Sequence, residues 1–476
     1  MFSSAAKVLH LFGCRGARST SSRFRAARVD AIQVPTSDFH ERTSSLVIRG
    51  DDENRPVVRN FSASARASQH TVLQLDGTQS QNATIEVQDD GRILEVTWRD
   101  NTHSRYHGIW LRHNCQCSDC KQAFSGQSLI EVSEIDPSQL KISNAKLIDD
   151  MLEVEWDEGQ TVHHGKVPIH LLHENCYSEE ARRRRKDESR IKQLHGGVIP
   201  RHCYHDIVKS DTAMLSWLQS INDYGLAVVT DIPLHEGAVV EFAELVSPVQ
   251  FGIYGKTYDI KYNPEPINIA YSSVPLGFHT DYIYLEAPLG VHLLHCLRFD
   301  PEVKGGESIF VDAFLVAEEL REKHPDHFET LVRVPATFQK IHVDRDFPVY
   351  MKFQTPTITV NHEKEIVAVR WGPYFEAPLQ VAEEDVLPYY QAQHVFGKLL
   401  QQSETRLKYR LQPGECVTFN NRRLLHGREG FTLNGGMRFF KGCYLNIDEV
   451  KSKTQLLMIT EGTGKLAKRV GNHCFL

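Results

Sequence analysis

The sequence predicts a two-domain, mainly β protein whose larger domain carries helices on its outside. Three observations lead to this fold class. The chain of 476 residues is longer than one ordinary hydrophobic core supports. Short segments in which apolar and polar residues alternate recur along most of it, and only a few stretches have helical periodicity. Contents of 41% apolar and 24% charged residues are typical of a globular protein.

Residues 1–70 differ in character from the rest of the chain. They begin with Arg, Lys, Ser and Ala, and no acidic residue precedes Asp30. This composition predicts a mitochondrial presequence and a location in the matrix. A disordered tail without a targeting role, and hence a cytoplasmic protein, is the alternative. The sequence has no long apolar run and a net charge of −7, so we expect neither a membrane nor nucleic acid as a partner.

Residues 71–180 are expected to form a small β-rich domain. Four of its segments alternate like strands: TIEVQD, RILEVTWRD, KLIDDMLEVEWDEG and KVPIHLL. A C-x-C-x2-C cluster of Cys115, Cys117 and Cys120 lies between the second and third segments, and its thiolates can face one ion. The remaining cysteines are scattered and form no secreted disulfide framework. The cluster predicts a structural zinc ion whose fourth ligand is one of the histidines His163, His164, His170 and His173.

The segment 181–195 begins with a basic run bounded by acidic residues, which indicates a solvated helix or a linker; we interpret it as a linker. A second domain is expected over 196–455 and a C-terminal tail over 456–476. The domain's expected elements are a helix and a buried strand in 211–232, a helix in 238–249, strands in 276–285, 291–297 and 308–314, a helix in 316–332, and strands in 416–419 and 437–444.

The pattern His-x-Asp occurs three times in this second domain, at His279/Asp281, His324/Asp326 and His342/Asp344. The second pair lies in a charged, helical stretch broken by a proline, which argues against a site. The third pair lies in a segment that could be a strand, and it is the serious rival. The first pair alternates with aromatic neighbours as on a strand, so that both side chains would leave the same face.

A third histidine, His426, follows a predicted turn and a buried strand, and Gly427 would let the backbone pass close to a metal. Two histidines and a carboxylate are the ligand set of non-haem Fe(II) oxygenases. Farther along, Arg438 lies in an alternating segment. Its planar guanidinium suits bidentate capture of a carboxylate, here that of 2-oxoglutarate. These residues predict an oxygenase that uses Fe(II) and 2-oxoglutarate.

Several segments together resemble one known family. NIAYSSVPLGFHTDY, PLGVHLLHCL, KGGESIFVDAF and NNRRLLHGREGF are similar to the gamma-butyrobetaine dioxygenase and trimethyllysine dioxygenase family of carnitine biosynthesis, over roughly residues 75–455. The resemblance implies a double-stranded β-helix (jelly-roll) core preceded by a zinc-binding domain. It also implies Fe(II) on His279, Asp281 and His426, 2-oxoglutarate on Arg438, ascorbate as a reductant, and a homodimer. The fourth zinc ligand that it implies is His163, and it demotes His342 and Asp344 to a structural strand.

Aromatic residues near these motifs bear on the substrate. The tyrosines are Tyr254, Tyr258, Tyr271, Tyr282 and Tyr444, and a cage of π faces suits a quaternary ammonium ion. The resemblance matches all of these except Tyr282 to the family's trimethylammonium cage, with Tyr258 in place of a Trp. It matches Asn268 to a contact of the substrate's carboxylate end. The chain departs from the family at residues 372–373, where Gly-Pro stands in place of an expected Asn.

The resemblance implies hydroxylation of gamma-butyrobetaine to L-carnitine with O2, releasing succinate and CO2. Phe278, before the first ligand pair, is more like the butyrobetaine enzyme, whereas a presequence is more like the trimethyllysine enzyme. Hydroxylation of trimethyllysine at C3 by the same mechanism is therefore the alternative. A catalytically silent, zinc-bearing interaction protein is a more distant one, although such a protein would need neither the three ligands nor Arg438.

Overall fold

The computed structural model describes residues 83–194, 197–266, 268–344, 347–467 and 469–474. The predicted targeting segment lies outside these residues, so the presequence stays a prediction. Within the described parts of the chain, none of the helices has both the length and the apolar character needed to cross a membrane.

Two antiparallel three-stranded sheets form the N-terminal part of the described chain. Their strands are β1 (Thr84–Gln88), β2 (Ile93–Thr97) and β3 (His103–His107) in one sheet, and β4 (Lys141–Ile148), β5 (Met151–Asp157) and β6 (Val162–Pro168) in the other. The short helices α1 (Gly108–His113) and α2 (Ile169–Glu174) follow one strand of each sheet. The alternating residues of β5 bury Leu152, Val154 and Trp156 in one core, as the pattern predicts.

The basic run that was interpreted as a linker is largely helical. Helix α3 spans Glu179–Glu188 and is N-capped by Ser178, whose hydroxyl accepts a hydrogen bond from the Ala181 N–H. Acidic residues occupy the first turn and basic residues the last turn, which suits the helix dipole. The run is therefore helical, with Ala181 and Arg185 buried, and the linker role of residues 181–195 stays a prediction.

A six-stranded and a four-stranded sheet form the core of the larger C-terminal part. The six-stranded sheet has the order β7 (Arg201–Cys203), β8 (Leu226–Thr230), β19 (Cys416–Asn420), β11 (Val291–Phe299), β22 (Arg438–Leu445), β9 (Tyr258–Lys261). The four-stranded sheet has the order β10 (Leu276–His279), β20 (Leu424–Arg428), β13 (Ser308–Asp312), β18 (Leu407–Tyr409). Phe310 and Phe419, one from each sheet, meet edge to face at 5.3 Å in a shared core. The mainly β, two-sheet jelly-roll prediction is confirmed.

Strand β11 shows how the sequence pattern positions residues in this core. Leu294 and Cys296 belong to the core shared by the two sheets, whereas Val291 and Leu293 pack in a separate core with the outer helices. Both faces of the strand are thus buried, which explains its nearly continuous apolar run. By the same alternation His292 points to the inner side, where the site described below lies.

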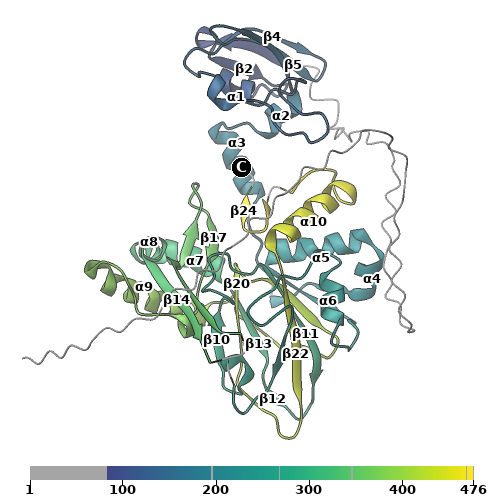
Figure 1. Ribbon diagram of the computed structural model, residues 1–476, viewed down its shortest axis with the longest axis vertical. Coiled ribbons are helices and arrows are strands. Elements are labelled where there is room, and N and C mark those ends of the chain that lie inside the picture. Colours follow the sequence, from purple (N-terminus) through teal and green to yellow (C-terminus); the bar gives the residue numbers. More distant parts are fainter. Residues whose placement is uncertain (1–82, 195–196, 267, 345–346, 468, 475–476) are drawn as a thin grey trace, which may run out of the picture. The chain divides into compact units, whose positions relative to one another are not determined.

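Helices cover the outer faces of both sheets (Figure 1). Beside the six-stranded sheet lie α4 (Tyr204–Lys209), α5 (Asp211–Tyr224), α6 (Ala238–Ala243) and α10 (Ile447–Thr460). On the other side lie α7 (Ala313–Lys323), α8 (Pro325–Arg333) and α9 (Glu383–Gln402). Four two-stranded antiparallel sheets complete the described strands: β12 (Lys304–Gly305) with β21 (Phe431–Thr432), β14 (Pro335–His342) with β15 (Val349–Pro356), β16 (Ile358–Val360) with β17 (Ile366–Val369), and β23 (Arg469–Val470) with β24 (His473–Cys474).

Three predicted boundaries differ from the structure. The strand expected over 308–314 ends at Asp312, because its carboxylate caps α7 by accepting from the Phe314 N–H at 3.1 Å. The helix expected over 238–249 ends at Ala243. The expected division between domain and tail at 455/456 falls inside α10, whose buried Leu457 and Met458 continue the core beside the six-stranded sheet.

Candidate functional site

Pairing of β10 with β20 brings the predicted metal ligands together. The strands are antiparallel, and His279 lies directly opposite His426. The centres of the two imidazole rings are 4.3 Å apart. Each Nε2 atom lies 3.3 Å from a different carboxylate oxygen of Asp281. All three residues therefore offer a ligand atom within 4.8 Å of the others, as one small metal ion requires.

Asp281 reaches this position from a turn, not from a strand. The prediction that one extended strand carries both ligands is wrong, because β10 ends at His279 and Tyr282 has a left-handed φ of 55°. The side chain of Asn421 fixes the turn from outside: its Oδ1 accepts from the Asp281 N–H at 2.9 Å, and its Nδ2 donates to the Asp281 carbonyl at 3.0 Å. Asn421 is fully buried, so this backbone position is rigidly held.

Electrostatics keep the carboxylate of Asp281 ionised. Burial would raise the pKa of Asp281, but the charges and hydrogen bonds of His426 and His279 hold that pKa well below its ordinary value. Burial also lowers the pKa of His426. The Nδ1 atom of His279 lies 3.0 Å from the Gly277 carbonyl, which can only accept a hydrogen bond. Nδ1 therefore carries the proton and leaves the Nε2 lone pair available to a metal.

Gly427 has a role in the pairing of these strands. A Cβ atom at this position would lie 2.4 Å from the Leu276 carbonyl oxygen and 2.9 Å from the Gly277 carbonyl oxygen. The glycine was expected to let the backbone approach a metal; the structure shows that it lets β20 approach the backbone of β10.

One cavity beside the metal ligands contains every residue predicted for the iron, cosubstrate and substrate sites. These are His279, Asp281, His426, Arg438, Tyr254, Tyr258, Asn268, Tyr271, Tyr282 and Tyr444. They come from β9, β10, β20, β22 and the segments that precede and follow β10. The structure thus brings together residues spread over almost two hundred positions of sequence.

The predicted cage tyrosines form a continuous aromatic wall. The rings of Tyr258 and Tyr444 are stacked with centres 5.5 Å apart, and Tyr282 meets Tyr444 edge to face at 5.4 Å. Tyr254 meets Tyr282 at 6.2 Å, and its hydroxyl accepts a hydrogen bond from Asn268 Nδ2 at 3.0 Å. The Tyr444 hydroxyl donates to Asp281 at 2.6 Å, so the wall is joined to a candidate metal ligand.

Arg438 is a buried cation without a carboxylate partner among the described residues. Its guanidinium lies over the Phe440 ring, with 4.1 Å to the ring centre, and its Nε donates to the Gly306 carbonyl at 3.2 Å. Burial, together with the nearby charge of Arg428, lowers the pKa of Arg438 to about 9. A buried guanidinium that lines a cavity and lacks a carboxylate partner can pair with the carboxylate of a ligand.

Among the polar residues of this cavity that sequence reasoning missed are His292 and Arg428. Burial lowers the pKa of His292 to about 3, so its imidazole is neutral at pH 7. It hydrogen-bonds the Tyr258 hydroxyl, stacks on Tyr444 at 4.6 Å and places Nδ1 3.5 Å from Asp281. The inward position of His292 on a buried strand was the available signal.

Arg428 ties β20 to the segment that carries two predicted substrate residues. Its guanidinium donates to the carbonyls of Ala270 at 2.8 Å, Ser272 at 2.8 Å and Val274 at 2.6 Å. The segment so held includes Tyr271 and begins two residues after Asn268. Because all three acceptors are distant in sequence from Arg428, no local pattern could have predicted these contacts.

The rival His-x-Asp pairs do not form metal sites in the described chain. His324 and Asp326 lie at the junction of α7 and α8, and His342 ends β14 on an edge of its hairpin. The described residues group only two sets of potential ligands, and neither includes these pairs. Phe278, which favoured one substrate by resemblance, packs in the outer core and does not line the cavity. Two residues beyond the Gly-Pro departure at 372–373, Phe375 lines the cavity.

The second set of potential ligands is the predicted zinc cluster. Nε2 of His163, on β6, lies 3.5 Å from Cys115 Sγ, 3.6 Å from Cys117 Sγ and 3.4 Å from Cys120 Sγ. Three sulfurs and one imidazole nitrogen at this spacing fit tetrahedral zinc without an open position. His164 instead points outward and pairs with Glu155 at 3.2 Å, so the geometry favours His163 among the alternatives.

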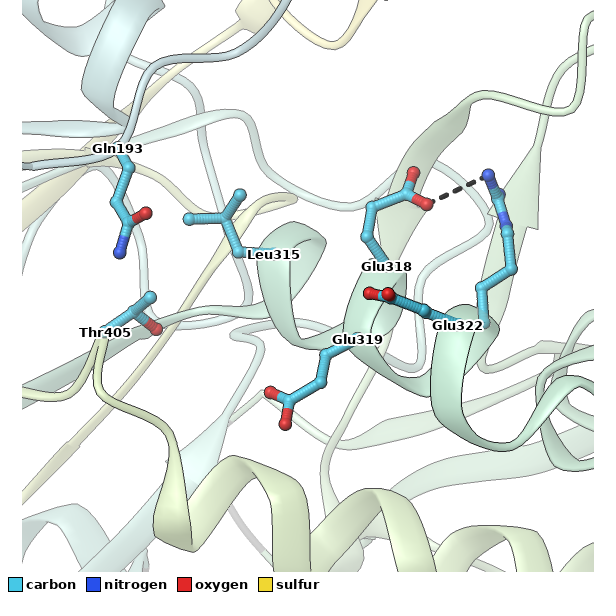
Figure 2. Close-up of a pocket in the computed structure, with 7 residues that line it drawn as sticks. Gln193, Leu315, Glu318, Glu319, Glu322 and Thr405 are labelled. Atoms are coloured by element: carbon cyan, nitrogen blue, oxygen red, sulfur yellow. Dashed lines mark ion pairs between the residues drawn. The ribbon is translucent and has the colours of Figure 1, made fainter.

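A separate hollow on α7 has a different chemistry. Figure 2 shows that Glu318, Glu319 and Glu322 lie around it, together with an ion pair in which Glu318 contacts Arg321 at 3.0 Å. Burial raises the pKa of Glu318. None of the predicted site residues lines this hollow, and acidic side chains alone do not specify a ligand.

Comparison with known proteins matches two parts of the chain to described families. Residues 192–444 match the family described as taurine catabolism dioxygenase TauD, TfdA family, and residues 85–150 match the N-terminal domain described as gamma-butyrobetaine hydroxylase-like. Gamma-butyrobetaine dioxygenases of Pseudomonas sp. (strain AK-1) and Homo sapiens are each 29% identical, over 76% and 78% of this chain and 93% and 96% of their own lengths. The mitochondrial trimethyllysine dioxygenase of Mus musculus is 27% identical over 87% of this chain and 96% of its own.

Proposed function

Because this chain belongs to the TauD/TfdA family of dioxygenases, we propose that it hydroxylates gamma-butyrobetaine to L-carnitine. It is an Fe(II)- and 2-oxoglutarate-dependent enzyme of the gamma-butyrobetaine and trimethyllysine dioxygenase type. In the proposed reaction one substrate C–H bond becomes C–OH, while 2-oxoglutarate and O2 become succinate and CO2. One oxygen atom of O2 enters the product and the other enters succinate. The silent interaction protein considered above is not supported.

Three residues would hold the iron. Bound to the metal, His279 and His426 would act as neutral imidazoles, and with the ionised carboxylate of Asp281 they would form one group of ligands beside the cavity. Bound Fe(II) would supply O2 activation coupled to the decarboxylation of 2-oxoglutarate. Asn421 holds the Asp281 backbone, and Gly277 fixes the His279 tautomer, so that the ligand atoms need little reorganisation when metal binds.

Arg438 would orient the cosubstrate. Its buried guanidinium lines the cavity and has no carboxylate partner among the described residues, so a ligand carboxylate would neutralise it. The phenyl rings around it exclude water and strengthen that ion pair. The position of the anchor then fixes which end of the 2-oxo acid faces the metal ligands.

The aromatic wall would bind the trimethylammonium group. The π faces of Tyr254, Tyr258 and Tyr444 attract a quaternary cation that has no N–H to donate and cannot form an ordinary salt-bridge hydrogen bond. Because Tyr444 also contacts Asp281, a cation held here has one end next to the metal ligands. The carbon chain beside that cation is thereby placed where it can be oxidised.

One observation favours gamma-butyrobetaine over trimethyllysine. Among the described residues that line the cavity, Asp281 is the only acidic one, and it is committed to the metal site. Trimethyllysine carries an α-ammonium group that would have no carboxylate to pair with there, and burying an unpaired charge is costly. Gamma-butyrobetaine carries only a carboxylate at that end, which Asn268 Nδ2 can meet as a donor.

The test offers both substrates to one preparation of the full-length protein. The protein is reconstituted with Fe(II) without air, then given 2-oxoglutarate and O2 with gamma-butyrobetaine or trimethyllysine, and succinate and product mass are followed. We expect gamma-butyrobetaine to gain one oxygen atom, and His279→Ala to abolish that gain. Oxygen gain on trimethyllysine alone would contradict the proposed substrate while leaving the reaction class intact.

Two further proposals concern the whole chain. We propose that Cys115, Cys117, Cys120 and His163 hold a structural zinc ion, because their spacing fits tetrahedral coordination. We also propose a location in the mitochondrial matrix, on the composition of residues 1–70. The homodimer implied by the resemblance stays a prediction.

A further inference from the structure

A second cavity, of about 270 Å³, lies beside the segment that carries the metal ligands. Thr280, whose backbone lies between His279 and Asp281, forms part of its lining. Arg370 follows β17, and Arg422 lies in the turn between β19 and β20; both line the cavity. The first turn of α10 and Asn472 contribute further residues. The cavity shares no lining residue with the cavity that holds the proposed substrate site.

Neither arginine forms an ion pair with a carboxylate among the described residues. Burial lowers the pKa of Arg422, and the charge of Asp448 opposes this only in part. Arg370 donates only to neutral oxygens, the Thr355 hydroxyl at 2.7 Å and the Glu286 carbonyl at 3.2 Å. Arg422 donates to the Pro288 carbonyl at 2.6 Å. The Nε atoms of both guanidiniums are buried without a hydrogen-bond partner. Burial and the neighbouring charge of Arg422 lower the pKa of Arg370 to about 10.

The remaining lining adds donors and little negative charge. Asn472 is 4% exposed, and its Nδ2 atom is buried without a partner, while its Oδ1 accepts from Asn420 at 2.6 Å. Asp448 is the one acidic residue among the described residues of the lining, and Lys451 pairs with it at 3.2 Å. Both belong to the first turns of the 14-residue helix α10, whose N-terminus carries partial positive charge.

We propose that this cavity binds a small oxyanion, a phosphate or carboxylate group held between Arg370 and Arg422. Two like charges in a partly buried site repel each other. An anion between them would offset this repulsion and would accept charge-assisted hydrogen bonds from both guanidiniums. Each arginine presents a planar fork that matches such a group. No such role follows from the dioxygenase reaction, whose cosubstrate anchor is in the other cavity.

Bound anion would also brace the metal-ligand turn. Arg370 precedes Trp371, whose carbonyl accepts from the Thr280 N–H at 2.7 Å. Arg422 follows Asn421, which holds the Asp281 backbone from the other side. An anion that joins the two guanidiniums therefore links two segments that flank the same turn, and its binding is coupled to the order of that turn.

The test is calorimetric titration of the full-length protein with inorganic phosphate, and separately with succinate, against sodium chloride at matched ionic strength. All titrations are repeated in Arg438→Gln, because the cosubstrate anchor is itself an anion site. We expect binding to persist in Arg438→Gln and to weaken about tenfold or more in Arg370→Gln and in Arg422→Gln. Lys398→Gln, which removes an exposed cation from α9, should bind like the unchanged protein.

Two readouts guard against a folding defect. Arg422→Lys keeps the charge and should retain weakened binding, and phosphate should raise the Tm of the unchanged protein more than that of Arg422→Gln. Binding of phosphate but not succinate would identify phosphate as the oxyanion, and the reverse would identify a carboxylate. Binding lost in Arg438→Gln but kept in Arg370→Gln and Arg422→Gln would overturn the proposal, as would no binding of either anion above chloride.

Discussion

At the scale of single residues, a chain of contacts joins the metal ligands to the aromatic wall. Tyr444 contacts Asp281 through its hydroxyl and stacks on Tyr258 through its ring. His292 contacts the Tyr258 hydroxyl and faces Asp281. These side chains fix one another's rotamers, so the aromatic faces proposed to bind the cation and the candidate metal ligands are positioned as one unit.

The aromatic wall should recognise charge and not only shape. We predict that gamma-butyrobetaine binds about 2-fold to 30-fold more tightly than its analogue with carbon in place of the quaternary nitrogen, which lacks the positive charge. In Tyr258→Leu this ratio should fall towards one, because a π face is lost while apolar contact remains. Competition of the two compounds in the succinate assay measures the ratio, and an unchanged ratio in Tyr258→Leu would contradict the role of this tyrosine.

His295 should make stability depend on pH. Its side chain is fully buried and both ring nitrogens lack partners among the described residues, and burial, with repulsion from His235, lowers its pKa to about 4. An unfolded histidine titrates near 6.5, so between these values the unfolded chain binds the extra proton. Stability is then complete above pH about 6.5 and falls as pH drops towards 4.

Between pH 7 and pH 5, the titration of His295 should lower the free energy of unfolding by about 2 kcal/mol. We predict that the free energy of unfolding falls by about 2 kcal/mol less in His295→Leu than in the unchanged protein when the pH drops from 7 to 5. This difference does not depend on the stability of the variant at pH 7. Urea denaturation at the two pH values measures it. His394→Leu, at an exposed position on α9, is the control, and a pH dependence equal to that of the control would contradict the prediction.

The residue types at the site could largely be predicted, because chemistry restricts them. Histidines and a carboxylate near one another, an inward arginine and clustered tyrosines each indicate a ligand, and one cavity contains them all. The residues that hold these groups in place could not. Asn421 and Arg428 act through backbone atoms 140 and more than 150 positions away, and neither contact leaves a local pattern.

At the scale of elements, the site depends on how closely β10 and β20 approach each other. We predict that Gly427→Ala lowers the free energy of unfolding by about 1–3 kcal/mol, since the added Cβ would overlap two carbonyl oxygens of β10. It should also weaken Fe(II) binding, because His279 and His426 are placed by this pairing.

Urea denaturation and metal titration check this expectation. Gly237→Ala serves as the control, because the atoms nearest its added Cβ belong to the flexible side chains of Glu241 and His235. Metal affinity as high in Gly427→Ala as in the control would show that the strand pairing tolerates a side chain here.

The elements were predicted correctly where burial is periodic. The predictions failed where contacts with distant parts of the chain end an element. Helix α5 follows its pattern because one of its faces lies in the core, and strand β8 follows its pattern because both of its faces are buried. The strand expected around the ligands ends early because the Thr280 and Asp281 N–H groups bond Trp371 and Asn421, which lie far along the chain. Periodicity carries no information about such partners.

At the scale of the whole molecule, the N-terminal sheets should depend on a metal. We predict about one zinc ion per chain, and its loss in His163→Ala, because among the described histidines only His163 faces the three thiols. His164→Ala is the matched control, since the side chain of His164, next to His163 in sequence, points outward and contacts Glu155. Elemental analysis of the purified variants decides the matter, and equal zinc in both would refute the assignment of His163.

The two-sheet architecture could be predicted from its strands, and the family resemblance supplied its topology. Strand order could not be derived from the pattern alone, because β8, β19, β11 and β22 are neighbours in the sheet but distant in sequence. The same topology places β10 and β20 side by side and so assembles the metal ligands. The N-terminal sheets and the jelly roll each form their own apolar cores.

The central claim is that this molecule is an oxygenase whose iron site and aromatic wall act on one trimethylammonium substrate. The most direct measurement is turnover of gamma-butyrobetaine under 18O2 by the Fe(II)-loaded protein with 2-oxoglutarate, followed by mass spectrometry. The account predicts one 18O atom in succinate and one in the hydroxylated product, with both lost in His279→Ala. Succinate without 18O, or an unmodified trimethylammonium compound beside labelled succinate, would contradict it.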